Sequence, residues 1–470
     1  MHNKSLSLVL GSIAGALTLS ACNLDIPDLN NPGLNQIEDT PTVSSINTAT
    51  TGLLVGFRAG KAPTVGFVNL LGILGREAYD FDAADPRFVS EVVQSNLNKS
   101  SPFGGSFWGG PYANIRQANI ILHGVEKVAE YSDAQRAGIQ GFAHTIIALE
   151  LLTVIVTHAE TGAVIDTDRP IDGPLGPFVS QAEVYAEIGR LLDQAKDELA
   201  AAGSAFSFPL SPGYTGFNTP ATFLTFNRAV RARVDVYTKK YQDALAHLAE
   251  SFLVDDTAKM GFAFTTGVSH SYSLNTGDVT NALINANIYA HPSLETDAQK
   301  QANGMPDARY TAKVQTMLND KKEVVTASAA NDMFMKTTRK FKIYTNVTSI
   351  PVIRNEELIL LKAEALWFSG DKTGALTELN IVRTNSGKLP AITDAPASDT
   401  AFVDLLLYER RYSLMYEGGH RWIDLRRFGR EIPVDGPAHI RNLRFPVPQA
   451  ECDARGSEAA CSITSSDPAK

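Results

Sequence analysis

The chain has 470 residues, a formal net charge of −9 at pH 7 and 44% hydrophobic residues. This length permits two or three domain-sized hydrophobic cores, or one large helical body with a long insertion. The acidic balance, without a basic patch, argues against a nucleic acid as partner.

The N-terminus has the pattern of an exported protein. Lys4 precedes an apolar run, residues 6–19, that is too short and too rich in small residues to span a bilayer comfortably. We therefore predict that residues 1–21 are a signal peptide.

The tripeptide Leu-Ser-Ala directly before Cys22 matches the lipobox of bacterial lipoproteins, which predicts that Cys22 is acylated, with palmitate as a typical chain. The alternative is an ordinary signal peptide beside an incidental cysteine. Each buried methylene contributes about 0.8 kcal/mol, so several acyl chains hold a protein at a membrane without a spanning helix.

The residues after Cys22 predict a tethered body. Residues 22–40 are polar and rich in Asn, Asp and Pro, so we expect a flexible leader there. The next apolar stretch, residues 142–156, is interrupted by His144 and Glu150 and predicts a core helix. Contact with the membrane is therefore expected through the lipid alone.

Residues 41–260 have mainly helical periodicity. Apolar side chains recur on one face over residues 113–131, 140–158 and 181–202, which predicts a helix over each segment. Residues 79–110 interrupt this pattern and predict a long loop.

Two later segments predict helical hairpins. Residues 226–252 and 357–382 each have an aromatic residue near the end of a first helix, a short polar turn, and Ala-Leu in a second helix. This layout resembles the tetratricopeptide repeat, in which small residues let two helices pack closely. Unrelated antiparallel helix pairs are the alternative. The predicted fold is all-α, a tetratricopeptide-like helical scaffold.

Residues 261–349, between the two hairpins, have a different composition, rich in Asn, Thr, Ser, Gly and Tyr. Such a long irregular segment is uncommon in a compact domain, and it is often a binding insertion. We predict a loop-rich insertion that carries the ligand face, followed by a second helical part over residues 350–470. In that part Cys452 and Cys461 predict a local disulfide, since an exported protein meets an oxidising compartment and no histidine cluster accompanies the pair.

The stretch YERRYSLMYEGGHRWIDLRRFGR, residues 408–430, combines charged and large apolar residues. We predict a helix over residues 403–416, a left-handed cap at Gly418-Gly419, and a second helix over residues 421–428 with Trp422 facing the body. The charged residues are expected to form buried arginine–carboxylate pairs that join the last helices to the hairpins. They are Glu409, Arg410, Glu417, Arg421 and Asp424. If so, Arg421→Ala lowers the unfolding midpoint.

This stretch resembles the C-terminal signature of SusD/RagB-like outer-membrane nutrient-binding lipoproteins, from Glu409-Arg410 through Glu417-Gly418 to Arg421-Trp422, Asp424-Leu425 and Arg427. Residues 176–199, 350–383 and 444–451 resemble further blocks of that family, in the same order. The chain departs from the family pattern at Ser413, where a glutamate is common, and at Gly419, which lengthens the turn.

The resemblance implies a SusD-like fold and a function. Family members capture an oligosaccharide, or sometimes a peptide, without cleaving it, and they sit on a TonB-dependent SusC-like transporter in the bacterial outer membrane. The expected location is the outer membrane, lipid-anchored and exposed at the cell surface. The alternative function is a helical-repeat lipoprotein that scaffolds envelope assembly and binds no small molecule.

A carbohydrate site requires aromatic rings that stack on the apolar faces of sugars, and polar groups that bind the hydroxyls. The two loop-rich segments supply such groups. Our candidates for ligand binding are Tyr79, Phe81, Asp82, Arg87, Tyr272 and Tyr289. Trp108 directly precedes a predicted helix, and we expect it to pack in the core.

Catalysis is not predicted. Glycoside hydrolysis needs one protonated and one ionised carboxyl group at a fixed separation, and the pairs considered are Glu417 with Asp424 and Asp80 with Asp82. The first pair lies among arginines that keep both groups ionised. No nucleophile elbow, zinc-binding helix or phosphate loop is found, so we predict no cofactor, no metal and no enzyme.

Overall fold

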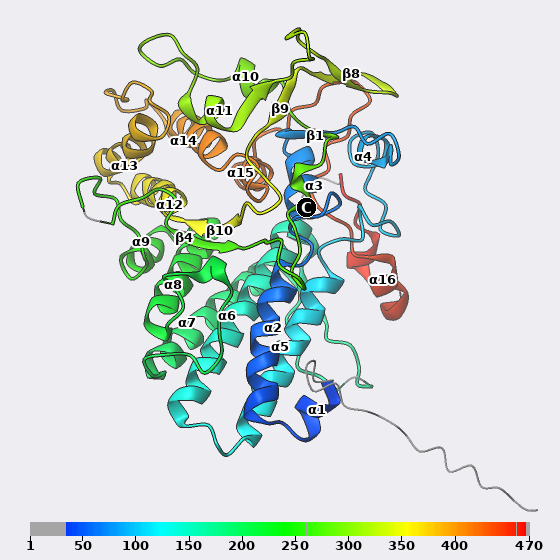
Figure 1. The fold of residues 1–470 in the computed structure, drawn as a ribbon, viewed down its shortest axis with the longest axis vertical. Coiled ribbons are helices and arrows are strands. Elements are labelled where there is room, and N and C mark those ends of the chain that lie inside the picture. Colours follow the sequence, from blue (N-terminus) through cyan, green and yellow to red (C-terminus); the bar gives the residue numbers. More distant parts are fainter. Residues whose placement is uncertain (1–33, 171, 260, 457, 467–470) are drawn as a thin grey trace, which may run out of the picture.

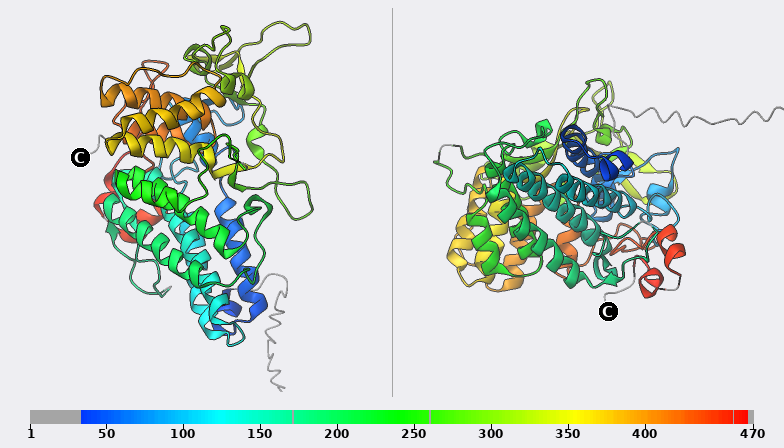
Figure 2. Two further views of the ribbon diagram at one scale, coloured as in Figure 1. Left: turned by 90° about the vertical axis from the view of Figure 1, so that its left-hand side faces the viewer. Right: turned by 90° about the horizontal axis from the view of Figure 1, so that it is seen from below.

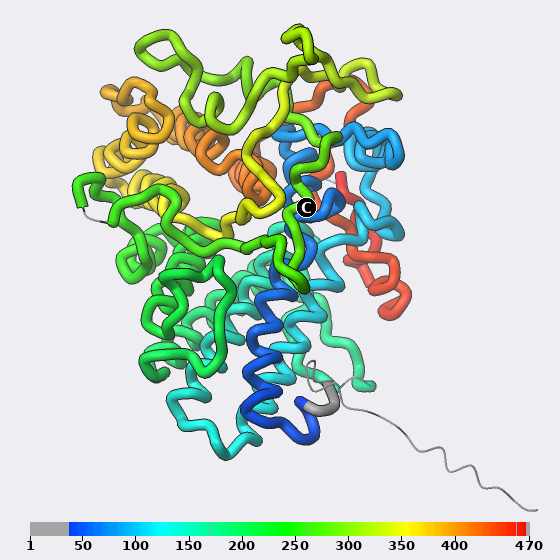
Figure 3. Tube along the Cα trace, viewed as in Figure 1, coloured from blue at the N-terminus to red at the C-terminus, as the bar shows by residue number. Residues whose placement is uncertain are grey.

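The structure is a computed structural model that describes residues 34–170, 172–259, 261–456 and 458–466. Figure 3 follows the chain through these residues. The predicted signal peptide, Cys22 and the first part of the leader lie outside them. Residues of the leader that are described form α1 (Leu34–Asp39), where Ile37 is buried, so this end of the leader is not the flexible coil that we expected.

The N-terminal half is a set of long helices that lie side by side, in the lower part of Figure 1. Helices that follow one another in sequence pack against each other: α5 contacts α6, α6 contacts α7, α7 contacts α8 and α8 contacts α9. The long helices are α2 (Val43–Arg58), α5 (Gly109–Lys127), α6 (Asp133–His158), α7 (Gln181–Ala201) and α8 (Pro220–Tyr237). The shorter helices of this half are α3 (Phe67–Leu74), α4 (Arg87–Ser90) and α9 (Tyr241–Ala249).

Side-chain caps fix where these helices begin. Ser180 accepts a hydrogen bond from the backbone of Glu183, whose carboxylate accepts one from the Ser180 backbone, and α7 starts at the predicted residue. This reciprocal arrangement is a capping box, and Ser132 and Gln135 form another at the start of α6. Helix α6 therefore begins seven residues before the predicted start at residue 140, because the first turns carry polar side chains but are well capped.

Helix α6 is the central helix of the core. Together with the turn that follows, residues Asp133–Thr161 are long and apolar enough to cross a membrane, but 89% of their most apolar window is buried inside the protein. This burial identifies α6 as a core helix, as the interrupting Glu150 indicated.

The C-terminal half repeats the helix-hairpin design. Helices α12 (Asn355–Phe368) and α13 (Lys372–Asn385) form a hairpin that packs on α8 and α9, where Tyr241 and Phe368 stack with ring centroids 5.0 Å apart. The turned view in Figure 2 shows these hairpins stacked on one another. The later helices are α14 (Asp399–Ser413), α15 (His420–Arg427) and α16 (Gln449–Arg455). The predicted all-α, tetratricopeptide-like fold is confirmed.

The insertion is richer in strands than we predicted. It contains short antiparallel pairs and two short helices, α10 (Ser293–Thr296) and α11 (Ala308–Lys313). Strand β6 (Val314–Thr316) pairs with β9 (Arg339–Phe341), and β7 (Ala327–Ala329) with β8 (Asp332–Thr337). These strands have three to six residues, too few for the alternating pattern that marks a strand in sequence.

Two strands of the insertion pair with strands outside it. Strand β4 (Gly267–His270) pairs with β10 (Ile350–Arg354), and β5 (Ile288–Ala290) pairs with β1 (Ala78–Asp80). A further pair, β2 (Ala163–Val164) with β3 (Phe178–Val179), closes the connection between α6 and α7. The β1–β5 pair therefore brings together the two segments that hold our ligand candidates.

The turn between α14 and α15 differs from the predicted glycine cap. Helix α14 ends at Ser413, and the left-handed residues of the turn are Tyr416, at φ 57°, and Gly419, at φ 72°. Gly419 precedes the first residue of α15, and a Cβ atom on it would lie 2.4 Å from the Cβ of Leu71. Gly419 is therefore required for close packing at the start of α15 and does not cap α14.

The C-terminal tail is closed by a covalent bond. Cys452, in α16, is joined to Cys461 by a disulfide with a Cα–Cα distance of 5.6 Å. Cys452 and Ala460 are buried in a small apolar cluster with Val447.

His158, the last residue of α6, provides a test of pH dependence. Its ring is fully buried, 4.9 Å from the Trp108 ring, and burial lowers its pKa to about 4. An unfolded histidine has a pKa of about 6.5, so between these values the unfolded chain binds a proton that the native chain does not. Stability therefore falls as the pH falls from 6.5 to 4, by about 3 kcal/mol for this group.

His158→Gln removes the titrating group, so we expect its unfolding free energy to fall less over that pH range than the wild-type value does. Urea unfolding at several pH values between 4 and 7 measures the difference. Parallel profiles for the two proteins would contradict the assignment.

Candidate functional site

The β1–β5 ladder gathers three of the predicted ligand residues into one aromatic cluster. Tyr79 lies directly opposite Tyr289 in the ladder. The ring centroids of Tyr79 and Phe81 are 5.2 Å apart, and those of Phe81 and Tyr289 are 5.4 Å apart. His291, two residues after Tyr289, completes the cluster with its ring 4.7 Å from that of Tyr79. Alternation along each strand places these side chains on one face.

Members of this cluster differ in exposure. Phe81 and Tyr289 are partly exposed, whereas only 1% of Tyr79 is exposed. The Tyr79 ring therefore has no free face for a ligand, and its prediction as a contact residue is wrong. Tyr79 instead stacks on Phe81, which in turn contacts Tyr289.

A buried polar network holds this cluster in place. His291 Nε2 lies 2.8 Å from the Asp435 carboxylate, and His439 Nε2 lies 2.6 Å from the Asp332 carboxylate. Burial alone would raise the pKa of Asp435, but the hydrogen bond from His291 and the nearby Arg76 outweigh burial and lower it. The network ties strand β8 and the chain around residue 435 to β5, so the aromatic rings rest on a fixed base. Sequence reasoning missed it, because its members are far apart in the chain.

Other predicted ligand residues lie around or away from the cluster. Asp82 directly follows Phe81 and is partly exposed. Arg87 is exposed, pairs with Asp85 at 2.8 Å and lies 4.9 Å from the Phe103 ring centroid. Tyr272 is only 6% exposed and packs beside Arg58 of α2, so it is unsuited to stack on a sugar. Trp108 is buried and packs on Tyr112, His158 and Phe178.

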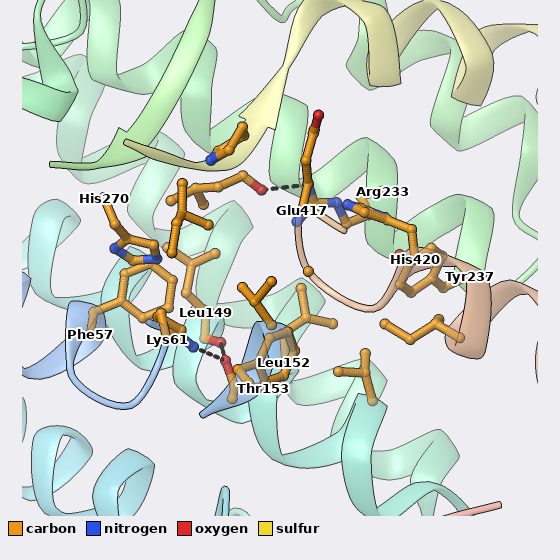
Figure 4. A pocket seen from close by; sticks show the side chains of 18 residues that line it. Phe57, Lys61, Leu149, Leu152, Thr153, Arg233, Tyr237, His270, Glu417 and His420 are labelled. Carbon is orange, nitrogen blue, oxygen red and sulfur yellow. Dashed lines mark hydrogen bonds between the residues drawn. The ribbon is translucent and has the colours of Figure 1, made fainter. Parts of the chain in front are cut away.

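A second feature is a cavity where the two halves of the protein meet, shown in Figure 4. Lys61, Thr153, His270 and His420 contribute to its wall, and the Lys61 ammonium donates a hydrogen bond to Thr153 over 3.3 Å. Burial lowers the pKa of Lys61 and lowers that of His420 to about 4. The cavity measures about 90 Å³, well below the roughly 300–1,000 Å³ of ligand pockets, so it can hold waters but not a sugar.

The carboxylates considered for catalysis are unsuited to it. Asp80 is 1% exposed and accepts a hydrogen bond from Asn69 at 2.9 Å, and burial raises its pKa to about 6. Burial would raise the pKa of Glu417, but Arg354 and Lys313 outweigh it and lower the pKa. Asp424 behaves likewise between Arg410 and Arg427. Within the described ranges, no group of three or more His, Cys, Asp or Glu residues could hold a metal ion.

Comparison with known proteins finds a matching family and related proteins. The model of the SusD family matches residues 260–459. A curated relative, SusD-like protein P38 from Formosa agariphila, is 37% identical over 97 residues, and this match covers 19% of this chain and 19% of the relative. Over this matched part, the chain is similar in sequence to the SusD/RagB-like family.

Solved SusD-like structures share the fold over most of this chain. A SusD-like carbohydrate-binding protein from Bacteroides fragilis is 16% identical with a TM-score of 0.65, over 87% of this chain and 98% of that chain. Surface glycan-binding protein A from Bacteroides uniformis is 18% identical with a TM-score of 0.64, over 89% of this chain and 99% of that chain. At these identities the similarity establishes the fold.

The SusD-like signature forms buried ion pairs with distant segments. Glu409 is fully buried between Arg309 of α11, at 2.6 Å, and Arg383 of α13, at 2.7 Å. Glu417 pairs with Arg354 of β10 at 2.9 Å and with Lys313 of α11 at 3.2 Å. The signature thus joins the insertion to strand β10 and to helix α13.

Arg410 and Asp424 form a pair within the signature itself. Their side chains meet at 2.6 Å, and Asp424 also accepts from Arg427, which pairs with Glu364 of α12 at 3.0 Å. Trp422 is fully buried and donates to the Asn442 carbonyl at 2.9 Å.

Arg421 departs from our prediction. Its Nε donates to the Gly75 carbonyl at 2.8 Å, and no carboxylate of a described residue lies within 4.0 Å of its guanidinium. Burial and the neighbouring Arg411 lower its pKa to about 9. The predicted arginine–carboxylate pair at this position is therefore wrong, and the contact of Arg421 with α3 is a hydrogen bond to the backbone.

Proposed function

We propose that this SusD-like protein binds a glycan at the Phe81–Tyr289 ring pair and delivers it, uncleaved, to a TonB-dependent transporter. The observation that supports this most is the ring pair itself. Two partly exposed aromatic rings, 5.4 Å apart, lie next to the partly exposed Asp82. Rings of this kind stack on the apolar C–H faces of sugars, and a carboxylate accepts hydrogen bonds from their hydroxyl rims.

A binding role without catalysis fits the chemistry of this site. Two described acids lie near Asp82 in the chain: Asp80 is buried and bonded to Asn69, and Asp85 is paired with Arg87, which lowers its pKa. A hydrolase needs two carboxyl groups that reach the glycosidic bond from opposite sides. Phe81, Tyr289 and Asp82 provide stacking and hydrogen bonding only.

Exposed apolar side chains on the insertion support a protein partner. Leu318 and Val324 face each other across a bridge and are 56% and 60% exposed, and Met333 on β8 is 81% exposed. Side chains of this kind mark contact surfaces on soluble proteins when they gather on one surface. A transporter barrel in the same membrane, as the family resemblance implies, is the partner we propose.

The glycan proposal is tested with a panel of soluble polysaccharides in affinity gel electrophoresis. We expect at least one polysaccharide to retard the native protein and none to be shortened by it. Absence of retardation across neutral and acidic glycans, together with binding of peptides, would redirect the proposal to peptide capture.

The partner proposal is tested by purifying the native protein from detergent-solubilised membranes. We expect a TonB-dependent barrel in stoichiometric amount. Envelope assembly factors in its place would favour the scaffold alternative.

The lipid anchor has a test of its own. Cys22→Ala removes the thiol that would be acylated, so we expect the variant to leave the membrane fraction and appear in the soluble fraction. Cys452→Ala, which breaks only the local disulfide, is the matched control and should remain with the membrane. Continued membrane association of the Cys22 variant would contradict lipidation.

A further inference from the structure

A second cleft lies on the helical scaffold, and no residue of the aromatic cluster lines it. The end of α6, the start of α7, the α8–α9 turn and the end of α15 surround a space of about 440 Å³. It adjoins the small cavity of Figure 4, since Val156, Tyr237 and Ile423 line both. Its volume is within the range of pockets that bind small molecules.

Three tyrosines define this tyrosine cleft: Tyr185 of α7, Tyr237 of α8 and Tyr241 of α9. None of their hydroxyls forms a hydrogen bond with another described residue. Burial raises the pKa of Tyr185 and of Tyr237, so these hydroxyls stay protonated and able to donate at neutral pH. Phe368 stacks on one face of Tyr241, and Arg427 lies over the Tyr237 ring, 4.6 Å from its centroid. The cleft thus offers the remaining ring surface together with hydroxyls that no described residue binds.

The charged groups of the tyrosine cleft are mainly cationic. Arg426 donates to the carbonyls of Trp422, Leu443 and Val156, which leaves two of its five N–H groups, and no described carboxylate lies within 4.0 Å of it. Lys239, in the α8–α9 turn, is exposed and forms no ion pair with a described residue. Glu160, which also lines the cleft, is already paired with Arg444 at 3.0 Å.

Lys239 is held in a position that favours a role in this cleft. Its backbone adopts φ 60°, in the left-handed region that non-glycine residues seldom occupy, between α8 and α9. The turn is fixed by backbone hydrogen bonds from Lys239 to Val236 and from Lys240 to Asp235, at 3.1 Å and 2.8 Å. Lys239 is exposed and lines the cleft, so it lies at the rim, on a turn whose backbone is fixed.

We propose that the tyrosine cleft binds a monosaccharide-sized sugar acid. Its carboxylate would pair with Lys239 and with the remaining N–H groups of Arg426, and its ring would lie against the tyrosines, whose hydroxyls bind the sugar hydroxyls. Charge-assisted hydrogen bonds to a carboxylate are roughly twice as strong as neutral ones, which gives selectivity for the acid over a neutral sugar. This inference goes beyond the proposed function, because it concerns a separate site.

Galacturonate is a suitable probe, and galactose is its neutral counterpart. We expect isothermal titration of the mature chain to detect galacturonate binding and to find galactose weaker by about fivefold or more. Lys239→Gln should weaken galacturonate binding about fivefold, while Lys240→Gln, one residue away and outside the cleft, should leave it unchanged.

Tyr185→Phe is a second variant that cannot disturb an existing hydrogen bond, and it should weaken binding about two- to tenfold. Equal binding of galactose and galacturonate, no binding of either, or equal effects of the two lysine substitutions would overturn the proposal. Because Phe81 and Tyr289 are intact in all these variants, retained polysaccharide binding would show that this inference alone has failed.

Discussion

Glu409→Ala is expected to lower the free energy of unfolding by about 3–5 kcal/mol. Glu409 is fully buried between Arg309 and Arg383. Removing its carboxylate leaves the Arg383 guanidinium buried without an acidic partner, while Arg309 keeps only Asp307. Uncompensated buried charge is costly because the desolvation of the arginine is no longer offset.

Urea unfolding followed by tryptophan fluorescence measures this effect. The matched control is Asp404→Ala on the same helix, where the carboxylate is 64% exposed and pairs with Arg430. We expect the control to shift the midpoint little, since exposed pairs contribute about 0–1 kcal/mol. Similar midpoints for the two variants would contradict the structural role that we assign to the signature.

The double variant Phe81→Ala/Tyr289→Ala is expected to bind much more weakly to the polysaccharide that retards the wild-type protein in gel electrophoresis. Loss of two stacking rings at the centre of a binding surface typically costs about 2–3 kcal/mol, which corresponds to about a 30- to 150-fold weaker affinity. Both rings are partly exposed, and neither belongs to the fully buried core, so the fold should survive their truncation.

Phe334→Ala is the control for this experiment. Phe334 is an aromatic side chain of the same insertion, 48% exposed, but it lies on β8 outside the ring pair. We expect its variant to bind polysaccharide as the wild type does. An unchanged affinity in the double variant would remove Phe81 and Tyr289 from the site.

The helical part of the fold is predictable from sequence because its signals are local. Apolar periodicity places α5, α7 and both hairpins, and the Ser180–Glu183 capping box fixes the start of α7. The start of α6 was missed, although Ser132 and Gln135 form the same kind of box, because the first turns of that helix are polar. The Ser132–Gln135 capping box itself marks the start of α6 at Asp133.

Long-range contacts are not predictable in the same way. The β1–β5 pair joins two three-residue strands about 200 residues apart, and neither strand is long enough to show alternation. The charged signature predicted buried ion pairs, but charge alone does not identify the residue with which each side chain pairs. Thus Arg410–Asp424 is local, whereas Glu409 pairs with Arg309, 100 residues upstream.

The candidate site was predicted in part. Phe81 and Tyr289, chosen as loop aromatics, lie together with free surface, while Tyr79 and Tyr272 are buried. Composition predicts which rings a loop contains, but which of them face solvent depends on the strand pairing beneath them. The tyrosine cleft was missed for a related reason, because Tyr185, Tyr237 and Arg426 come from helices whose stacking only the fold defines.

Glycan capture at the β1–β5 cluster is tested most directly by hydrogen–deuterium exchange. The exchange is measured with and without the polysaccharide that retards the protein in gel electrophoresis. Backbone amides bonded in a short ladder exchange more slowly when a ligand fixes that ladder. We predict added protection in peptides that cover residues 78–82 and 287–291, and little change in α14 and α15. Protection confined to other segments, with these two unchanged, would contradict the location of the site.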